Sequence, residues 1–243
     1  MLTDRVAIAL EQHMFLPFLP LLAIGVILGF EHTLEADHIV AVITLTSHTK
    51  SVRRAVFLGA TWGLGHAVIL IAVSFIILIT RVVIPERLAL LLEMAVGVLL
   101  IGLGIDTVWK ALKGELRFRV HEHDGVTHAH LHSTGQSHDH HTRRSFLSGI
   151  IQGLAGSAAM VLLVVSTFAS VIDGLVFIAC FGLGLIVGIA LITILLTAPF
   201  KLTVKTERLN QMMRVAAGAL SLIVGLALIY QIGFVQGLLL HGV

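Results

Sequence analysis

Residues 29–39 read GFEHTLEADHI and follow directly on the apolar run FLPFLPLLAIGVIL of residues 15–28. The stretch places five ionisable side chains, Glu31, His32, Glu35, Asp37 and His38, within eight residues. Water would accommodate such a cluster without difficulty. Near the centre of a bilayer, however, each charged side chain costs roughly 2.5 to 3.5 kcal/mol on scales obtained from membrane insertion. If the surrounding chain lies in a membrane, this cluster therefore needs a function.

The composition of the chain indicates a membrane protein. Of its 243 residues, 57% are hydrophobic and 12% are charged, and the mean hydropathy is +0.99. Soluble domains carry about 25% charged residues. The sequence therefore predicts an all-α polytopic protein, whose apolar segments of about 20 residues cross the hydrocarbon core of the lipid bilayer. Six such spans are expected, at residues 15–30, 55–80, 88–112, 146–172, 174–200 and 212–237.

The basic residues are distributed unevenly between the two sides of the expected membrane. If the spans alternate in direction, only Arg5, Arg81 and Arg87 of the 16 Lys and Arg residues fall on one side. Basic residues are enriched in cytoplasmic loops. We therefore expect a multi-pass protein of the cytoplasmic membrane, with both termini outside and residues 113–145 in the cytoplasm. This distribution explains the basic residues without a nucleic-acid partner.

The two halves of the chain share a pattern of residues. PERLALLLEMAVGVLLIGLG (85–104) resembles TERLNQMMRVAAGALSLIVG (206–225), with Glu-Arg-Leu and two glycines in register. Upstream, WGLGHAVIL (62–70) resembles FGLGLIVGI (181–189), and Gly25 and Gly29 match Gly149 and Gly153 at a slightly different offset. Three spans in each half would give an inverted repeat, which is typical of secondary transporters with a site near the midplane.

Three domains follow from this repeat. Residues 1–112 are expected to form the first three-helix repeat, and residues 146–243 the second. Residues 113–145 form the connection between them, which we call the His-rich loop. Where the first half has its polar cluster, the second has GLAGSAAMVLL (153–163) and Leu185. The polar chemistry is therefore expected in the first half.

The polar cluster contains the residue types of a transition-metal site. Imidazole and carboxylate groups together suit divalent first-row metal ions. A lone histidine in a membrane helix is more often a packing or hydrogen-bonding residue, but the joint pattern of His32, Asp37, His38 and His66 favours a metal site. Glu35 is a further candidate ligand, and Glu31 is an alternative to it.

The spacing within the cluster carries a structural prediction. On an ideal helix with about 100° per residue, His32 and His38 would point about 120° apart. One regular helix cannot bring both to the same ion. If both bind one metal, the helix must break between Glu31 and Ile39, as helices at transporter sites do.

The His-rich loop provides a second signal for metal. Its segment HEHDGVTHAHLHSTGQSHDHH (121–141) holds eight of the fourteen histidines of the chain. These residues are His121, His123, His128, His130, His132, His138, His140 and His141. Such a tract is typical of flexible metal-binding sequence, and zinc, nickel, cobalt and copper all accept imidazole. We expect an accessory metal site here and a candidate docking place for a cytoplasmic metallochaperone.

Two of these motifs resemble those of a known family. HTLEADHI (32–39) is similar to the His-x4-Asp-His signature of the nickel/cobalt transporter (NiCoT) family, which commonly has Asp where this chain has Glu35. LGH (64–66) resembles the Leu-Gly-His motif in the next span of that family. The resemblance implies that His32, Asp37, His38 and His66 recognise Ni²⁺ or Co²⁺. Longer members have eight spans and an acidic Asp-Thr motif in the second half, so this chain is more similar to the short urease-accessory-type relatives. Its loop also resembles that of nickel/cobalt efflux proteins.

The expected function is secondary transport without a cofactor or an enzymatic reaction. The chain has no Gly-x4-Gly-Lys-[Ser/Thr] phosphate loop. An inside-negative potential of 100 mV contributes ~4.6 kcal/mol to the inward movement of a divalent cation. Import is therefore favoured, and export by proton exchange through Glu35, Asp37 or His38 is the alternative.

Two further classes of function also fit some of these residues. Three histidines with an aspartate could hold zinc and activate water in an intramembrane hydrolase. A metal sensor or urease-assembly partner would bind metal in the His-rich loop and transport none.

Overall fold

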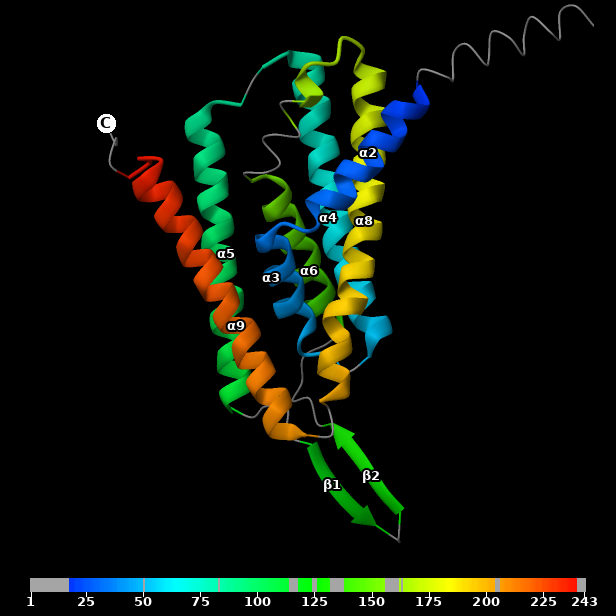
Figure 1. Ribbon diagram of the computed structural model, residues 1–243, viewed down its shortest axis with the longest axis vertical. Helices are drawn as coiled ribbons and strands as arrows, with labels where there is room; N and C mark the ends of the chain where they lie inside the picture. Colours follow the sequence, from blue (N-terminus) through cyan, green and yellow to red (C-terminus); the bar gives the residue numbers. More distant parts are fainter. Residues whose placement is uncertain are drawn as a thin grey trace, which may run out of the picture.

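The computed structural model describes residues 18–239, apart from residues 50, 83, 114–117, 124–125, 132–137, 156–161, 163 and 204–205. Helices form nearly all of this part of the chain and lie side by side in an elongated bundle (Figure 1). In chain order they are α2 (Phe18–His32), α3 (Ala36–Thr46), α4 (Val52–Thr80), α5 (Glu86–Lys113), α6 (His138–Gly153), α8 (Val171–Leu202), α9 (Glu207–Tyr230) and the π-helical turn η1 (Gln231–Val235).

Within the described residues, four helical segments are long and apolar enough to cross a membrane. They are α4, α5, α8, and α9 continued by η1, with lengths from 28 to 32 residues. At 1.5 Å per residue each exceeds the ~30 Å hydrocarbon core of a bilayer. The second, third, fifth and sixth expected spans are thereby confirmed, and the chain is a helical protein of the multi-pass membrane type.

The first and fourth expected spans differ from the prediction. Instead of one helix over residues 15–30, the structure has two shorter apolar helices, α2 and α3. Instead of one helix over residues 146–172, α6 ends at Gly153 and a turn follows. Residues 164–166 are again helical, and α8 begins at Val171. Hydropathy is blind to such breaks, because an apolar run scores equally whether its backbone is continuous or interrupted. Helix α6 also begins eight residues early, because its polar first two turns, HDHHTRRS, lie at the end of the bundle.

The bundle is built on two antiparallel helix pairs. Helices α4 and α8 form the first pair, with Trp62 and Leu70 packed against Phe177, Phe181 and Leu185 in one core cluster. Helices α5 and α9 form the second, and the short helix α3 lies between the pairs (Figure 1). The core thus surrounds α3, whose first turn carries part of the polar cluster.

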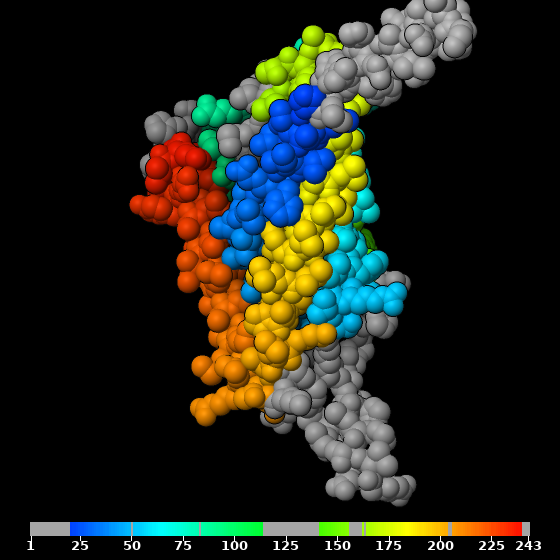
Figure 2. Space-filling model, turned by 45° about the vertical axis from the view of Figure 1, so that its right-hand side comes forward, coloured from blue at the N-terminus to red at the C-terminus, as the bar shows by residue number. Residues whose placement is uncertain are grey.

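The outer faces of the long helices are apolar. Leu195 of α8 is 73% exposed and Ile223 of α9 is 63% exposed. Figure 2 shows α2 lying along α8 on one such face. In water these side chains would be unfavourably hydrated, whereas lipid chains are as apolar as leucine. The surface is therefore suited to a bilayer.

Glycines bring α5 and α9 into backbone contact. A methyl group on Gly104 would lie 2.7 Å from the carbonyl oxygen of Gly218, and one on Gly218 would lie 2.9 Å from that of Gly104. Gly97 and Gly225 make the same reciprocal contact, at 3.1 Å and 2.7 Å. Small residues of this kind allow membrane helices to approach closely. In the sequence match between the halves, Gly97 aligns with Gly218 and Gly104 aligns with Gly225. In the structure, each glycine of α5 contacts the glycine of α9 that aligns with the other.

The two flanking helices also make matching contacts. Gly29 of α2 lies against the backbone of Phe181 and Leu185 in α8. Gly149 of α6 lies in the same way against the backbone of Trp62 and His66 in α4. By these contacts, Gly149 is the structural counterpart of Gly29. The sequence comparison matched Gly29 with Gly153 instead, about one helical turn later.

The His-rich loop contains a β-hairpin at one end of the bundle (Figure 1). Strands β1 (Phe118–His123) and β2 (Val126–Leu131) pair antiparallel, with His121 opposite His128 and Arg119 opposite His130. The sequence predicted flexible chain here, so the paired strands are a difference from the expectation. Period-two alternation such as FRVHEH favours a strand. His132 lies outside the described residues.

Candidate metal centre

The polar cluster lies at a break between two helices. Helix α2 ends at His32, residues 33–34 form a turn, and Glu35 has extended backbone (φ −63°, ψ 142°) before α3 begins. The hydroxyl of Thr33 donates a hydrogen bond to the Phe30 carbonyl at 2.6 Å, which offers the backbone an alternative to continued helix. The break expected between Glu31 and Ile39 is confirmed. It removes the angular divergence of a regular helix and turns His32 and His38 toward one another.

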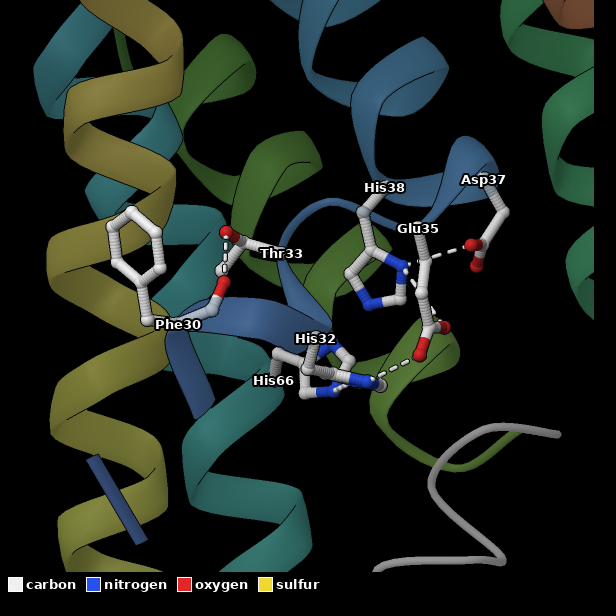
Figure 3. A network of polar contacts seen from close by, with 7 residues as sticks. All are labelled: Phe30, His32, Thr33, Glu35, Asp37, His38 and His66. Carbon is white, nitrogen blue, oxygen red and sulfur yellow. Dashed lines mark hydrogen bonds and ion pairs between the residues drawn. The ribbon is translucent and has the colours of Figure 1, made fainter. Parts of the chain in front are cut away.

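Three histidines meet at this break (Figure 3). His32 is 6% exposed, and His38 and His66 are fully buried. One ring nitrogen from each lies within 4.8 Å of those of the other two, and the Nε2 atoms of His32 and His66 are 3.4 Å apart. Two nitrogens that bind one tetrahedral ion at 2.0–2.1 Å are about 3.4 Å apart. The three imidazoles could therefore converge on a single ion with small adjustments.

Two carboxylates stand behind the imidazoles. Glu35 Oε1 is 2.8 Å from Nδ1 of His32, and Asp37 Oδ1 is 2.9 Å from Nδ1 of His38. Glu35 Oε2 is also 3.8 Å from Nδ1 of His38. A carboxylate at Nδ1 favours the proton on that nitrogen and leaves Nε2 as a free donor of electrons. The sequence placed Asp37 and Glu35 among the candidate ligands, and the structure places them against the outer nitrogens of two histidines.

Aromatic rings enclose the centre. The indole of Trp62 lies 5.2 Å from the rings of both His38 and His66, measured between centroids. The ring of Phe181 lies 5.3 Å from that of His32. These rings place surroundings of low polarity against the imidazoles, which strengthens any interaction of the imidazoles with an ion.

Sequence reasoning missed one polar residue of the second half. Gln152 lies in the last turn of α6, is 1% exposed, and has no hydrogen-bond partner for either amide atom within the described chain. It directly precedes the apolar segment that led us to confine the polar chemistry to the first half. If Gly149 of the second half corresponds to Gly29 of the first, Gln152 corresponds to His32, because both pairs are 120 residues apart. An alignment of the two halves at an offset of 120 residues would have matched Gln152 with His32. The sequence match of the glycines used an offset one helical turn longer and so missed Gln152.

Among the described residues, the histidines of the His-rich loop lie outside this centre. His121, His123, His128 and His130 belong to the hairpin, and His138 and His140 to the first turn of α6. His141 lines a different small cavity at the same end of the bundle, together with His48, Asp106 and Arg144. Within the described residues the structure thus gathers only the first-half candidates, His32, Glu35, Asp37, His38 and His66, into one place.

Fold and centre together define a class: a polytopic helical membrane protein in which buried histidines and partly buried carboxylates cluster at a helix break. Over 229 residues the chain is 33% identical to the urease accessory protein UreH of Bacillus sp. (strain TB-90), and the match covers 90% of this chain and 95% of that protein. The chain therefore belongs to the UreH family of urease accessory proteins. No family model matches the chain, and no solved structure matches it significantly.

Proposed function

We propose that this protein is a secondary transporter of a divalent transition-metal ion, Ni²⁺ or Co²⁺, and not an enzyme. The observation that carries the proposal is the convergence of three buried imidazoles, each with a ring nitrogen within 4.8 Å of those of the other two, at a helix break inside a helical membrane bundle. The relation to a urease accessory protein favours nickel. The motif resemblance to the NiCoT family favours nickel or cobalt.

In this proposal the ion binds to His32, His38 and His66 through Nε2. Glu35 and Asp37 hold the first two imidazoles in the required tautomer. Their two negative charges also match the charge of a divalent ion. A loaded centre is then close to neutral, which lowers the cost of holding the ion away from water.

We also propose that the six expected spans form two inverted three-helix repeats around this centre. The packing of α2 on α8 resembles the packing of α6 on α4, and the contacts between α5 and α9 are reciprocal. Helices α2 and α3 together would make the first span. Helix α6 and the chain after its break would make the fourth.

The distribution of charge supports the orientation expected from the sequence. Basic residues gather at the hairpin end of the bundle, where α4, α6 and α9 begin and α5 and α8 end (Figure 1). They include Arg54, Lys110, Arg144, Lys201 and Arg208. Cytoplasmic loops are rich in Lys and Arg. The hairpin end is therefore proposed to face the cytoplasm, with metal moving inward.

The test is metal flux in proteoliposomes that hold the full chain. A panel of Ni²⁺, Co²⁺, Zn²⁺ and Mn²⁺ is offered to wild type, His38→Ala and the control His48→Ala, whose imidazole lies outside the centre. We expect uptake of Ni²⁺ or Co²⁺ by wild type and the control, and a loss of at least tenfold in His38→Ala. Equal flux in all three proteins would contradict the site. Metal-driven proton exchange in the outward direction would support export.

A further inference from the structure

The three imidazoles of the centre differ in one respect. Nδ1 of His32 and of His38 each face a carboxylate, at 2.8 Å and 2.9 Å. Nδ1 of His66 is fully buried and has no hydrogen-bond partner in the described part of the chain. A metal-binding imidazole almost always donates its second N–H to a carboxylate, a carbonyl or a water. Among the three histidines, only His66 therefore lacks a described partner for its Nδ1.

A second buried group lacks a partner on the neighbouring helix. The amide oxygen and the amide nitrogen of Gln152 are both buried without a hydrogen bond to any described residue. A buried polar group in this state is unfavourable, because it has given up its hydrogen bonds to water without gaining others. An unpaired amide inside the bundle therefore favours a hydrogen-bond partner that Gln152 reaches in another side-chain conformation or through water.

The packing of α6 on α4 places Gln152 at the level of His66. A methyl group on Gly149 would lie 3.1 Å from the backbone nitrogen of His66, and one on Gly153 would lie 2.8 Å from the backbone carbonyl oxygen of His66. Gln152 is thus in the turn of α6 that touches the backbone of His66.

The distance along the helices gives the same level independently. Thr44 of α3 and Ser145 of α6 line one small cavity near the hairpin end. From there Gln152 lies seven residues up α6, or about 10 Å, and His38 lies six residues up α3, or about 9 Å. Gln152 and His38 therefore lie at about the same height along the bundle.

The side of α6 that carries Gln152 faces the interior. His141, Ser145, Ser148 and Gln152 recur at intervals of four, three and four residues, so they lie on one helical face. Ser145, Ser148 and Gln152 are buried, and His141 and Ser145 line the cavity shared with α3. Gln152 therefore approaches the space between α3 and α4, where His38 and His66 lie.

We propose that Gln152 is a positioning residue for His66. Its amide oxygen accepts the Nδ1–H of His66, directly after a side-chain rotation or through one bridging water, and so turns Nε2 of His66 toward the ion. The inference rests on the proposed function. The second half of the chain thereby contributes chemistry to the centre.

The experiment measures Co²⁺ binding to the purified full-length protein by its visible absorption, which reports coordination geometry. The variants are Gln152→Leu and Gln152→Glu, and the control is Asn210→Leu. Asn210 is also a buried amide, but it donates to the Phe200 carbonyl and to Thr203 away from the centre. We expect Gln152→Leu to weaken binding 10- to 100-fold and to change the Co²⁺ spectrum. Gln152→Glu should restore both, because a carboxylate accepts the same N–H, and Asn210→Leu should leave both as in wild type.

A double-mutant cycle separates positioning from general stability. In a His66→Ala background, Gln152→Leu should have no further effect on Co²⁺ affinity, because its partner is gone. Additive losses, or a Gln152→Leu protein with the wild-type spectrum and affinity, would overturn the inference and leave the transport proposal standing. A wild-type protein that binds no Co²⁺ and no Ni²⁺ would instead overturn both.

Discussion

At the scale of single residues, two carboxylates lie against Nδ1 of two of the three histidines. Glu35 and Asp37 contact Nδ1 of His32 and His38, which suits a role in orienting these imidazoles, and together with His38 they also form a second group that could hold a metal ion. The residue types and the need for a helix break could be predicted from the sequence, because both follow from chemistry and helical angle. Which nitrogen faces inward could not, because it depends on the rotamers around Glu35 and on the packing of α4.

Substitutions of Asp37 test this division of roles. Asp37→Asn keeps an oxygen that accepts from Nδ1 of His38 but removes a negative charge, whereas Asp37→Ala removes both. We expect a 10- to 100-fold loss of Ni²⁺ affinity in Asp37→Ala and a smaller loss in Asp37→Asn. Isothermal titration of the purified protein measures both. If Asp37→Ala binds as wild type does, Asp37 neither binds the ion nor orients His38.

His48 gives a prediction for stability against pH. It lies in the turn after α3, outside the membrane-spanning helices, and both ring nitrogens are buried without a partner in the described chain. Burial, followed by the charge of Arg214 and other nearby cations, lowers its pKa to about 3. The charged and titratable groups around it are Asp106 and Lys110 of α5, Arg144 and His141 of α6, and Arg214 of α9.

Folded protein therefore keeps His48 neutral where the unfolded chain, with a pKa near 6.5, binds a proton. The stability that neutral His48 contributes is complete above pH 6.5 and falls by up to ~1.4 kcal/mol per pH unit from pH 6.5 toward pH 3. His48→Leu should show a shallower loss of stability between pH 7.5 and pH 5 than wild type. Thermal unfolding in detergent at four pH values measures the difference, and parallel curves would count against a neutral buried His48.

At the scale of elements, the long helices and one of the two helix breaks could be predicted from the sequence. Apolar windows identify α4, α5, α8 and α9, because each of these helices contains a run of apolar residues long enough to cross a membrane. The interruptions after His32 and after Gly153 arise where side chains and neighbouring helices satisfy the freed backbone groups. A sequence window contains no information about those neighbours. Only the ligand geometry of His32 and His38 indicated the first break, and the second half offered no such constraint.

The contact between α2 and α8 fixes the position of His32. Gly29, one turn before His32, lies against the backbone of Phe181, so an added methyl group forces the two helices apart. Gly29→Ala should destabilise the protein by about 1 to 3 kcal/mol and weaken Ni²⁺ binding. Gly102→Ala on α5 is the matched control, because no heavy atom lies within 4 Å of the added group. Equal melting temperatures for the two variants would show that α2 does not pack closely on α8.

At the scale of the whole molecule, the hairpin and the centre are separate parts. The strands β1 and β2 lie at the end of the bundle, and the centre lies at the helix break in its interior (Figure 1). Removal of residues 118–131 with a short Gly-Ser replacement should lower the number of Ni²⁺ ions bound per chain. Transport should stay within about twofold of wild type, since His32, His38 and His66 are untouched. Complete loss of flux would place the loop on the permeation path.

The energy source of transport is a property of the whole bundle in its membrane. Moving a divalent ion inward across an inside-negative 100 mV potential gains ~4.6 kcal/mol, which permits more than a thousandfold accumulation. We therefore expect Ni²⁺ uptake into proteoliposomes to rise with an imposed potassium-diffusion potential at constant pH. It should change little when a pH gradient is imposed at zero potential. The opposite pattern, flux that follows the pH gradient and ignores the potential, would mean that protons exchange for the metal, and the direction of transport would then be outward. His38→Ala measured under both conditions shows whether either flux passes through the centre.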